Sequence, residues 1–309
     1  MDSPIASSQR LPTCSIVIPT RQRLNSLKRC LDAIAASDYP AGQIEIIVVD
    51  DGGQGGSAIE DVVRPLRARF EAGIIKTSGL GPAGARNAGA NEAAGEMLAF
   101  TDDDCQVDSG WTRTLCGALG RSEETAAGGH TFNGLRNNRW SAASQHIIDL
   151  VYAYYNADPA RAGFLTTNNL AVHKNAFREL GGFDQRYRTA EDRDFCRRWV
   201  ERGHAMIYVP QALVSHQHAL TIAGFWRQHF GYGRGAFRFL RATSSKRQIQ
   251  VIRDFYRAMP RLISALAHNQ GGGSQRCASL VTEMALWQAA NIAGFAWEAA
   301  RSAQYRLRP

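Results

Sequence analysis

Three consecutive aspartates, Asp102, Asp103 and Asp104, are the residues of this chain best suited to chemistry. They follow Met97–Phe100, an apolar run of the kind that forms a buried strand. Neighbouring carboxylates repel one another, so a cation is expected beside them. An Asp-x-Asp pair at the carboxyl end of a strand can supply the oxygen ligands that Mg²⁺ or Mn²⁺ prefers. A solvated acidic turn without a metal would show the same residues.

Four further segments carry polar side chains where a strand ends or a helix begins. They are Pro19, Thr20 and Arg21 after an apolar run, Asp50 and Asp51 after a second one, Arg86 where a glycine-rich turn enters a helix, and Glu191 with Asp192 at the start of an amphipathic helix. Each segment also has a structural explanation, because acids fill polar turns and helix caps and an arginine on a helix can be solvated. Their joint occurrence favours a functional site.

Two histidines, His216 and His218, follow another short apolar run. Alternate side chains of a strand project to the same side, so both imidazoles are expected to point the same way. Beside carboxylates an imidazole is a metal ligand that favours Mn²⁺ over Mg²⁺. A structural role explains either histidine equally well.

These residues need a framework that gathers the ends of several strands. We expect strands at 14–18, 44–49, 73–76 and 97–101, with helices at 57–69 and 85–94 among those between them. Short links between such elements predict an α/β fold, a parallel sheet covered by helices on both faces. No Gly-x-Gly-x-x-Gly follows the first strand, which argues against a dehydrogenase-type fold. Further strands are expected at 126–131, 164–172, 206–209 and 212–216, and from 221 onward only helical periodicity remains.

In this order and spacing the motifs resemble family 2 glycosyltransferases, inverting enzymes of the GT-A fold, over residues 13–235. The resemblance implies a Rossmann-like, mostly parallel sheet with helices on both faces, plus a C-terminal helical extension. It divides the chain into a tail (1–12), a catalytic domain (13–220) and a basic helical region (221–309). Within the catalytic domain, 13–105 would be the nucleotide-binding half and 106–220 the acceptor half.

The resemblance also implies a nucleotide-sugar donor and the residues that hold it. These are Pro19, Thr20, Arg21, Asp50, Asp51, Arg86, Asp102 and Asp103. An acid here can accept the imide N–H of uracil, which favours UDP. Mn²⁺ or Mg²⁺ would be held by Asp102, Asp104 and one histidine, for which we choose His216 over His218.

The family's catalytic acids map onto Glu191 and Asp192. We expect Asp192 to deprotonate the acceptor hydroxyl while the nucleotide departs from the other face of the sugar, which inverts the anomeric centre. Glu191 is the second choice for the base. Either acid can instead merely cap the helix. The Gln-x-x-Arg-Trp of processive members does not occur in the sequence, so we expect one sugar to be moved to a glycan or lipid-linked acceptor.

Charge is unevenly distributed along the chain. The formal net charge is +8, yet residues 1–218 hold 23 Lys and Arg against 25 Asp and Glu, whereas residues 219–309 hold 13 against 3. A basic region with aromatic residues between its arginines favours peripheral contact with an anionic membrane. Packing on the catalytic domain, or oligomerisation through the C-terminal helices, explains the pattern equally well. No nucleic acid is expected.

Composition limits the other classes of protein. The six cysteines are widely spaced with no C-x-x-C pair, and there is neither an N-terminal signal-like stretch nor an apolar run of membrane-spanning length. We therefore expect a cytoplasmic enzyme, peripheral at the inner face of the membrane if its basic region binds lipid. Two alternatives stay open: a nucleotidyltransferase, which would release diphosphate from a nucleoside triphosphate, and a non-catalytic scaffold that binds a membrane or a partner.

Overall fold

The computed structural model describes residues 11–53, 56–243, 246–269, 271 and 274–306. Within these residues the strands form a single sheet in the order β3-β2-β1-β4-β7-β6-β8-β5. The strands are β1 (Cys14–Thr20), β2 (Ile44–Asp51), β3 (Glu71–Thr77), β4 (Met97–Phe100), β5 (Cys105–Val107), β6 (Thr125–Asn133), β7 (Leu170–His173) and β8 (Ala205–His216). The helices are α1 (Leu24–Ala35), α2 (Gly56–Val63), α3 (Gly81–Glu92), α4 (Trp111–Leu119), α5 (Arg139–Tyr155), α6 (Lys174–Leu180), α7 (Glu191–Glu201), α8 (Ile222–Thr243), α9 (Lys246–Asn269) and α10 (Ser274–Arg306), with short 3₁₀ turns at η1 (Ala41–Gln43), η2 (Arg64–Ala68), η3 (Pro159–Arg161) and η4 (Thr167–Asn169).

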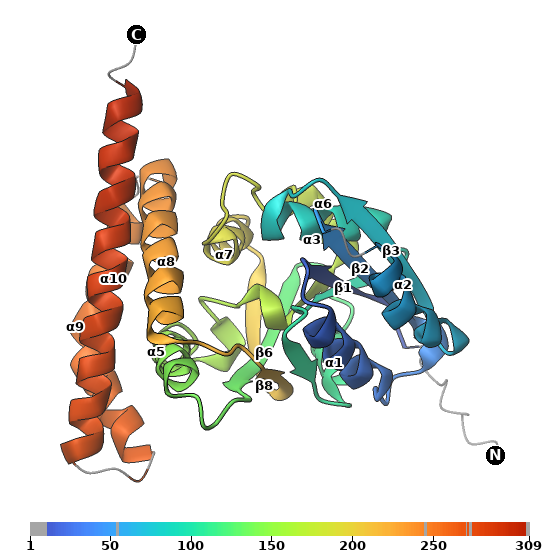
Figure 1. Cartoon of the computed structure of the whole chain (residues 1–309), viewed down its shortest axis with the longest axis horizontal. Helices are drawn as coiled ribbons and strands as arrows, with labels where there is room; N and C mark the ends of the chain where they lie inside the picture. Colours follow the sequence, from blue (N-terminus) through green and yellow to red (C-terminus); the bar gives the residue numbers. More distant parts are fainter. Residues whose placement is uncertain (1–10, 54–55, 244–245, 270, 272–273, 307–309) are drawn as a thin grey trace, which may run out of the picture.

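Strand β1 shows why the sheet is buried on both faces. Ile16 and Ile18 belong to a core shared with α1, α2 and α4, whereas Val17 belongs to a second core shared with α3, α6 and α7. Both faces of β1 are therefore apolar, and the strand reads as a continuous hydrophobic run rather than an alternating one. The predicted layering of helices on both faces is confirmed (Figure 1).

The part of the sheet that lies within residues 13–105 follows the prediction closely. Strands β1, β2, β3 and β4 run parallel to one another. Helix α3 begins at Gly81, four residues before the predicted start, because Pro82 fits the first turn of a helix. Helix α2 ends at Val63 rather than near residue 69, since Pro65 cannot donate an intrahelical hydrogen bond and a 3₁₀ turn replaces the last turns.

The strands from residue 105 onward make the sheet mixed. Strand β7 runs antiparallel to β4 and β6, β8 runs parallel to β6, and β5 runs antiparallel to β8. The predicted strand over 164–172 is wrong for its first six residues. There the backbone of Phe164 is held by the Asn156 side chain, and the N–H of Thr166 donates to the Tyr152 hydroxyl, so strand partners are not needed.

Strand β8 joins the two short strands predicted at 206–209 and 212–216. Its pairing with β6 shifts register between Gly129 and His130, so that Val209 and Leu213 pair with consecutive residues of β6. A Cβ on Gly129 would lie 2.0 Å from the carbonyl oxygen of Ala212, which makes glycine necessary here. This irregularity lets β8 continue to His216 at the site described below.

The C-terminal helices α8, α9 and α10 form a third core together with α5. Figure 1 shows α8, α9 and α10 gathered at one end of the molecule, beside α5. Helix α8 packs closely on α10, because a Cβ on Gly233 would lie 2.0 Å from the backbone oxygen of Asn291. Among the described residues, no helix is long and apolar enough to cross a membrane. Most of the predicted N-terminal tail lies outside the described residues.

Candidate active site

The ends of β1 and β4 meet at a buried hydrogen bond. The hydroxyl of Thr20, the last residue of β1, donates to Asp103 Oδ2 at 2.7 Å. Both side chains are buried. Burial raises the pKa of the Asp103 carboxyl to about 6, although Arg23 and Thr20 act in the opposite direction. Asp103 therefore faces the protein interior and fixes the loop that carries its two neighbours.

Arg23 supplies the cation that the aspartates require. Its guanidinium lies 2.6 Å from Asp103 Oδ1 and 2.6 Å from Asp104 Oδ2. Arg21, which the resemblance assigned to the nucleotide-sugar donor, is exposed. Gln22 between them has a positive φ of 56°, and this bend brings the chain to Arg23 at the start of α1. The aspartate triplet itself was the signal that a nearby cation had to be found.

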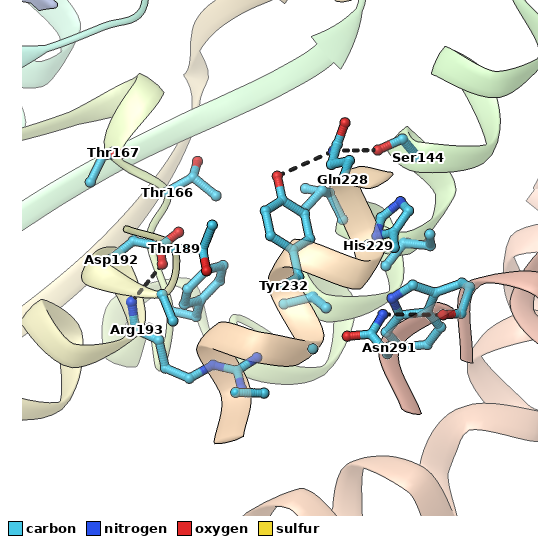
Figure 2. Close-up of a pocket in the computed structure, with 18 of the residues that line it drawn as sticks. Ser144, Thr166, Thr167, Thr189, Asp192, Arg193, Gln228, His229, Tyr232 and Asn291 are labelled. Carbon is cyan, nitrogen blue, oxygen red and sulfur yellow. Dashed lines mark hydrogen bonds between the residues drawn. The ribbon is translucent and has the colours of Figure 1, made fainter. Parts of the chain in front are cut away.

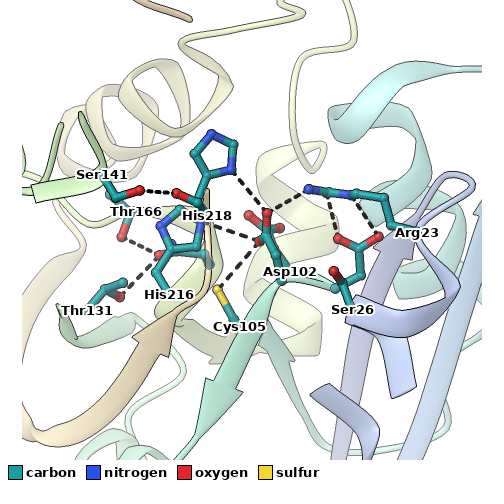
Figure 3. A network of polar contacts seen from close by, with 12 residues as sticks. Arg23, Ser26, Asp102, Cys105, Thr131, Ser141, Thr166, His216 and His218 are labelled. Carbon is teal, nitrogen blue, oxygen red and sulfur yellow. Dashed lines mark hydrogen bonds and ion pairs between the residues drawn. The ribbon is translucent and has the colours of Figure 1, made fainter. Parts of the chain in front are cut away.

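Asp104 lies beside two histidines, His216 at the end of β8 and His218 two residues beyond it. His216 Nε2 lies 3.3 Å from Asp104 Oδ1, and His218 Nδ1 lies 3.4 Å from Asp104 Oδ2. The two imidazoles stack at 5.2 Å, so they project to the same side as expected. Figure 3 shows them on one side of this polar network and Arg23 on the other. Burial alone would raise the pKa of Asp104, but the hydrogen bonds from His216 and His218 and the charge of Arg23 hold it well below its ordinary value.

This cluster fits a hard divalent cation. Ligand atoms of Asp104, Cys105 and His216 all lie within 4.8 Å of one another. Burial raises the pKa of the Cys105 thiol well above its usual range, so the carboxylate and the imidazole are the better ligands for Mn²⁺ or Mg²⁺. His218 is turned toward α8, where its Nε2 lies 3.0 Å from Gln228 Oε1. Asp102 lies outside the cluster.

Asp102 is held by Arg86 instead. Arg86 Nη2 donates to Asp102 Oδ1 at 2.6 Å, and Arg86 Nη1 donates to Glu191 Oε1 at 3.1 Å. Arg86 is buried in α3, and Glu191 opens α7. The guanidinium thus joins the Asp-x-Asp loop to the predicted catalytic helix. A solvated surface arginine, the alternative for Arg86, does not describe this residue.

Asp50 and Asp51 end β2 beside the first turn of α3. Asp51 Oδ1 accepts hydrogen bonds from Thr77 Oγ1 and the Leu80 N–H, and Oδ2 accepts one from the Gly81 N–H. Asp50 Oδ1 accepts a hydrogen bond from the Gly53 N–H. Asp51 therefore fixes the turn into α3, and Asp50 is the acid of the pair with fewer protein partners.

Glu191 and Asp192 begin α7 after a strained residue. Ala190 has φ 76°, a left-handed conformation that costs free energy for alanine. Burial, followed by the charge of Asp192, raises the pKa of Glu191 to about 7, and burial also raises the pKa of Asp192. Glu191 is buried against Arg86, whereas Asp192 is partly exposed and lines a cavity. Asp192 Oδ1 accepts a hydrogen bond from the Arg193 N–H at 2.7 Å.

The cavity of about 640 Å³ collects these groups in one place. Its lining includes Arg86, Asp102, Glu191, Asp192, His216 and His218. Its other wall comes from α5, α8, α9 and α10, and Figure 2 shows Tyr232 of α8 facing Thr189 and the start of α7, where Asp192 lies. Sequence reasoning missed this wall, because the helices that form it are far from the motifs along the chain.

Two family models and several curated proteins match this chain. The sequence model of the family described as "Glycosyl transferase family 2" matches residues 15–181, and that of "Glycosyl transferase family group 2" matches residues 101–304. Glycosyltransferase AglE of Haloferax volcanii is 22% identical over 227 residues, which cover 73% of each chain. The pre-mycofactocin glycosyltransferase of Mycobacterium tuberculosis is 25% identical over 72% of this chain, and the match spans 46% of that longer protein.

Solved structures share the fold. The mannosyltransferase PcManGT from Pyrobaculum calidifontis, in complex with GDP-Man and Mn²⁺, superposes with a TM-score of 0.65 at 20% identity, covering 94% of this chain and 88% of the other. GalNAc-T7 with UDP, GalNAc and Mn²⁺ gives a TM-score of 0.55 at 17% identity, covering 74% and 51%. The GT-A architecture expected from the motifs is confirmed, and the chain belongs to glycosyl transferase family 2.

Proposed function

We propose that this glycosyltransferase moves one sugar from a nucleoside-diphosphate sugar, UDP-linked in the first instance, to an acceptor hydroxyl with inversion of the anomeric centre. The observation that carries the proposal is the bridge from Asp102 through Arg86 to Glu191. It brings the predicted nucleotide end of the sheet and the predicted catalytic helix to one cavity.

The donor would bind along the ends of β1, β2 and β4. Pro19, Thr20 and Arg21 end or follow β1, Asp50 is the nucleoside acid, and Arg86 can meet a phosphate or a base carbonyl. Asp51 and Asp103 shape this site from the interior through the hydrogen bonds described above. The similar solved structures hold UDP or GDP-Man, so the experiment below is designed to identify the nucleobase of the donor.

Asp104 and His216 would hold Mn²⁺ or Mg²⁺, with Asp102 joining them once Arg86 turns to the donor. Bound there, the metal would neutralise charge on the leaving diphosphate. Support comes from the depressed pKa of Asp104 and from the imidazole and carboxylate atoms that already face one another.

Asp192 would act as the general base. A base needs access to the acceptor and a pKa near the working pH, and Asp192 is partly exposed in the cavity with a raised pKa. Glu191 is engaged with Arg86, which suits it to position its neighbour and to tune that neighbour's pKa.

A panel of UDP- and GDP-sugars tests the proposal. We expect one nucleotide sugar to raise the melting temperature only when Mn²⁺ or Mg²⁺ is present, and to be hydrolysed slowly to the nucleoside diphosphate. With an acceptor, NMR should show the anomer opposite to that of the donor. Retention of the anomer would overturn the inverting mechanism. Release of diphosphate from a nucleoside triphosphate would indicate a nucleotidyltransferase instead.

A further inference from the structure

The cavity extends well beyond the groups that the proposed reaction uses. Its catalytic part is polar, but the helices on the other side contribute a wall of large apolar side chains. These are Ile147, Ile148 and Val151 of α5, Leu240 of α8, Ile252, Phe255 and Tyr256 of α9, and Trp287, Ile292 and Phe295 of α10. A volume of about 640 Å³ lies in the usual range for small-molecule sites.

Several of the side chains that line the cavity are exposed to solvent. Ile292 is 66% exposed although it lines the cavity, and Tyr232, Tyr256 and Phe295 lining the same space are also exposed. Apolar surface gathered in a hollow next to reactive groups indicates a ligand with an apolar part.

His229 of α8 gives a second, independent indication. It is 1% exposed, it lines the cavity, and among the described residues neither of its ring nitrogens has a hydrogen-bond partner. Burial lowers its pKa to about 4, so the ring is neutral near pH 7 and offers one donor and one acceptor. A buried polar group without a partner is costly, and a ligand with a hydroxyl or amide group would provide one.

Two glycines tie this wall to the catalytic acids. A Cβ on Gly235 of α8 would lie 2.3 Å from Thr189 Oγ1, in the loop that leads to Glu191, and a Cβ on Gly233 would meet α10. The Thr189 hydroxyl also donates to the Gly231 carbonyl at 3.1 Å. The distance from the apolar wall to Asp192 is therefore fixed by backbone contacts.

We propose that the acceptor is amphipathic: its reacting hydroxyl lies at Asp192, and the apolar group attached to it occupies the space between α5, α8, α9 and α10, with His229 bonding a polar group at the junction. This inference rests on the proposed function. The chemical class is a hydroxyl or sugar carried on an aliphatic chain, and a free hydrophilic glycan does not match the wall.

Alkyl β-D-glucosides of increasing chain length are suitable probes. The full-length protein is titrated with methyl, butyl, hexyl and octyl glucoside below their micelle-forming concentrations, and binding is followed by tryptophan fluorescence, since Trp287 lines the cavity. Each buried methylene should tighten binding by about fourfold. A dissociation constant independent of chain length would overturn the proposal, whatever sugar the enzyme prefers.

Three variants locate the binding. Ala236 lines the cavity, so Ala236→Phe should fill it and weaken octyl glucoside binding at least tenfold. Ile292→Gln should weaken it similarly. The control is Val281→Gln, another exposed position on the same face of α10 about three turns away and outside the cavity. Equal losses in Ile292→Gln and Val281→Gln would show surface adsorption and reject the cavity as the site.

A measurement of donor binding shows whether the amphipathic acceptor or the proposed transfer reaction has failed. Metal-dependent stabilisation by the nucleotide sugar should be unchanged in Ala236→Phe and Ile292→Gln. If the donor binds and the chain-length effect is missing, the amphipathic acceptor is wrong and the transferase stands. If the chain-length effect maps to the cavity and no nucleotide sugar binds, the apolar site stands and the proposed reaction is wrong.

Discussion

Arg86 Nη1 lies 3.1 Å from Glu191 Oε1, although 105 positions separate the two residues in the sequence. This contact fixes the start of α7 against α3, and so it orients the neighbouring Asp192 toward the cavity. Because Glu191 is buried and paired, removing its charge should disturb Arg86 and the donor site. Removing the charge of Asp192 should leave that pair intact. The two acids are therefore separable by experiment.

Replacing Asp192 by asparagine should lower kcat by about 10² or more while donor affinity stays near that of the wild type. The amide keeps the size of the side chain but cannot accept the acceptor's proton. Turnover with any active acceptor and donor affinity by calorimetry check this. Glu191→Gln is the matched comparison and should raise the donor's dissociation constant as well. Wild-type turnover in Asp192→Asn would transfer the role of base to Glu191.

Activity should fall as the pH drops below about 7. The pKa of Glu191 is raised to about 7 and that of Asp192 is also raised, so lowering the pH protonates this pair while an unperturbed carboxylate would still be ionised. In Glu191→Gln the repulsion between the two acids is gone, and the acidic limb of the kcat/KM profile should move to lower pH. A limb that is unchanged in this variant would contradict the coupling.

Donor binding should require Mn²⁺ or Mg²⁺, and Asp104→Ala should weaken it severely. Asp104 is the carboxylate that His216 and His218 both approach, so it is the central member of the proposed metal site. Thermal stabilisation by nucleoside diphosphate is measured with metal and with excess chelator. His218→Ala is the comparison. If His216 is the ligand, His218→Ala should weaken nucleotide binding less than His216→Ala does. Undiminished nucleotide binding in chelator would reject the site.

His229→Phe should make the protein less sensitive to acid. The ring has a pKa of about 4 in the folded protein and about 6.5 when unfolded. As pH falls through this window the unfolded state takes up the proton first, so the wild type loses folding free energy on the order of 3 kcal/mol. The variant should lack this loss. Urea denaturation at pH 7 and pH 4.5 measures it, and His268→Gln, at an exposed position, should behave like the wild type.

The parts of the fold that the sequence predicted are those in which local pattern and tertiary structure agree. The apolar runs of β1, β2 and β4 need no other information, because both faces of each are buried. The strand predicted over 164–169 does not form. Its apolar and polar residues resemble a strand, but the hydrogen bonds of its backbone are made with Asn156 and Tyr152. Side-chain partners of this kind leave no periodic signal.

The site was predictable to the level of motifs and no further. Asp104 and the two histidines are brought together, as the family resemblance implied. The ion pairs of Arg23 with Asp103 and Asp104 could not be predicted, because they depend on the bend at Gln22. The apolar wall could not be predicted either, because helical periodicity in α8 and α10 shows that a face is buried but not which surface it covers.

The basic C-terminal region was expected to lie on an anionic membrane or to pack on the protein. In the structure some of its aromatic residues are buried and others are exposed. Phe225 and Phe239 are buried, and Arg234 and Arg238 pair with Glu298. These residues are already satisfied within the protein. Trp226 of α8 and Trp297 of α10 are exposed, and tryptophan rings at such positions can insert at headgroup depth.

Trp297→Glu should therefore reduce co-sedimentation with anionic vesicles at low salt, because it removes an inserting ring and adds a charge that the lipid repels. Val281→Glu makes the same charge change on α10 roughly 160° around the helix, so it should keep most of the binding. Raising the salt concentration should release the wild type and Val281→Glu from the vesicles, because salt screens the attraction of the basic residues for anionic lipid. If the wild type stays in the supernatant at low salt, the exposed tryptophans serve another contact, and analytical ultracentrifugation of Trp297→Glu would then test whether that contact is a second copy of the chain.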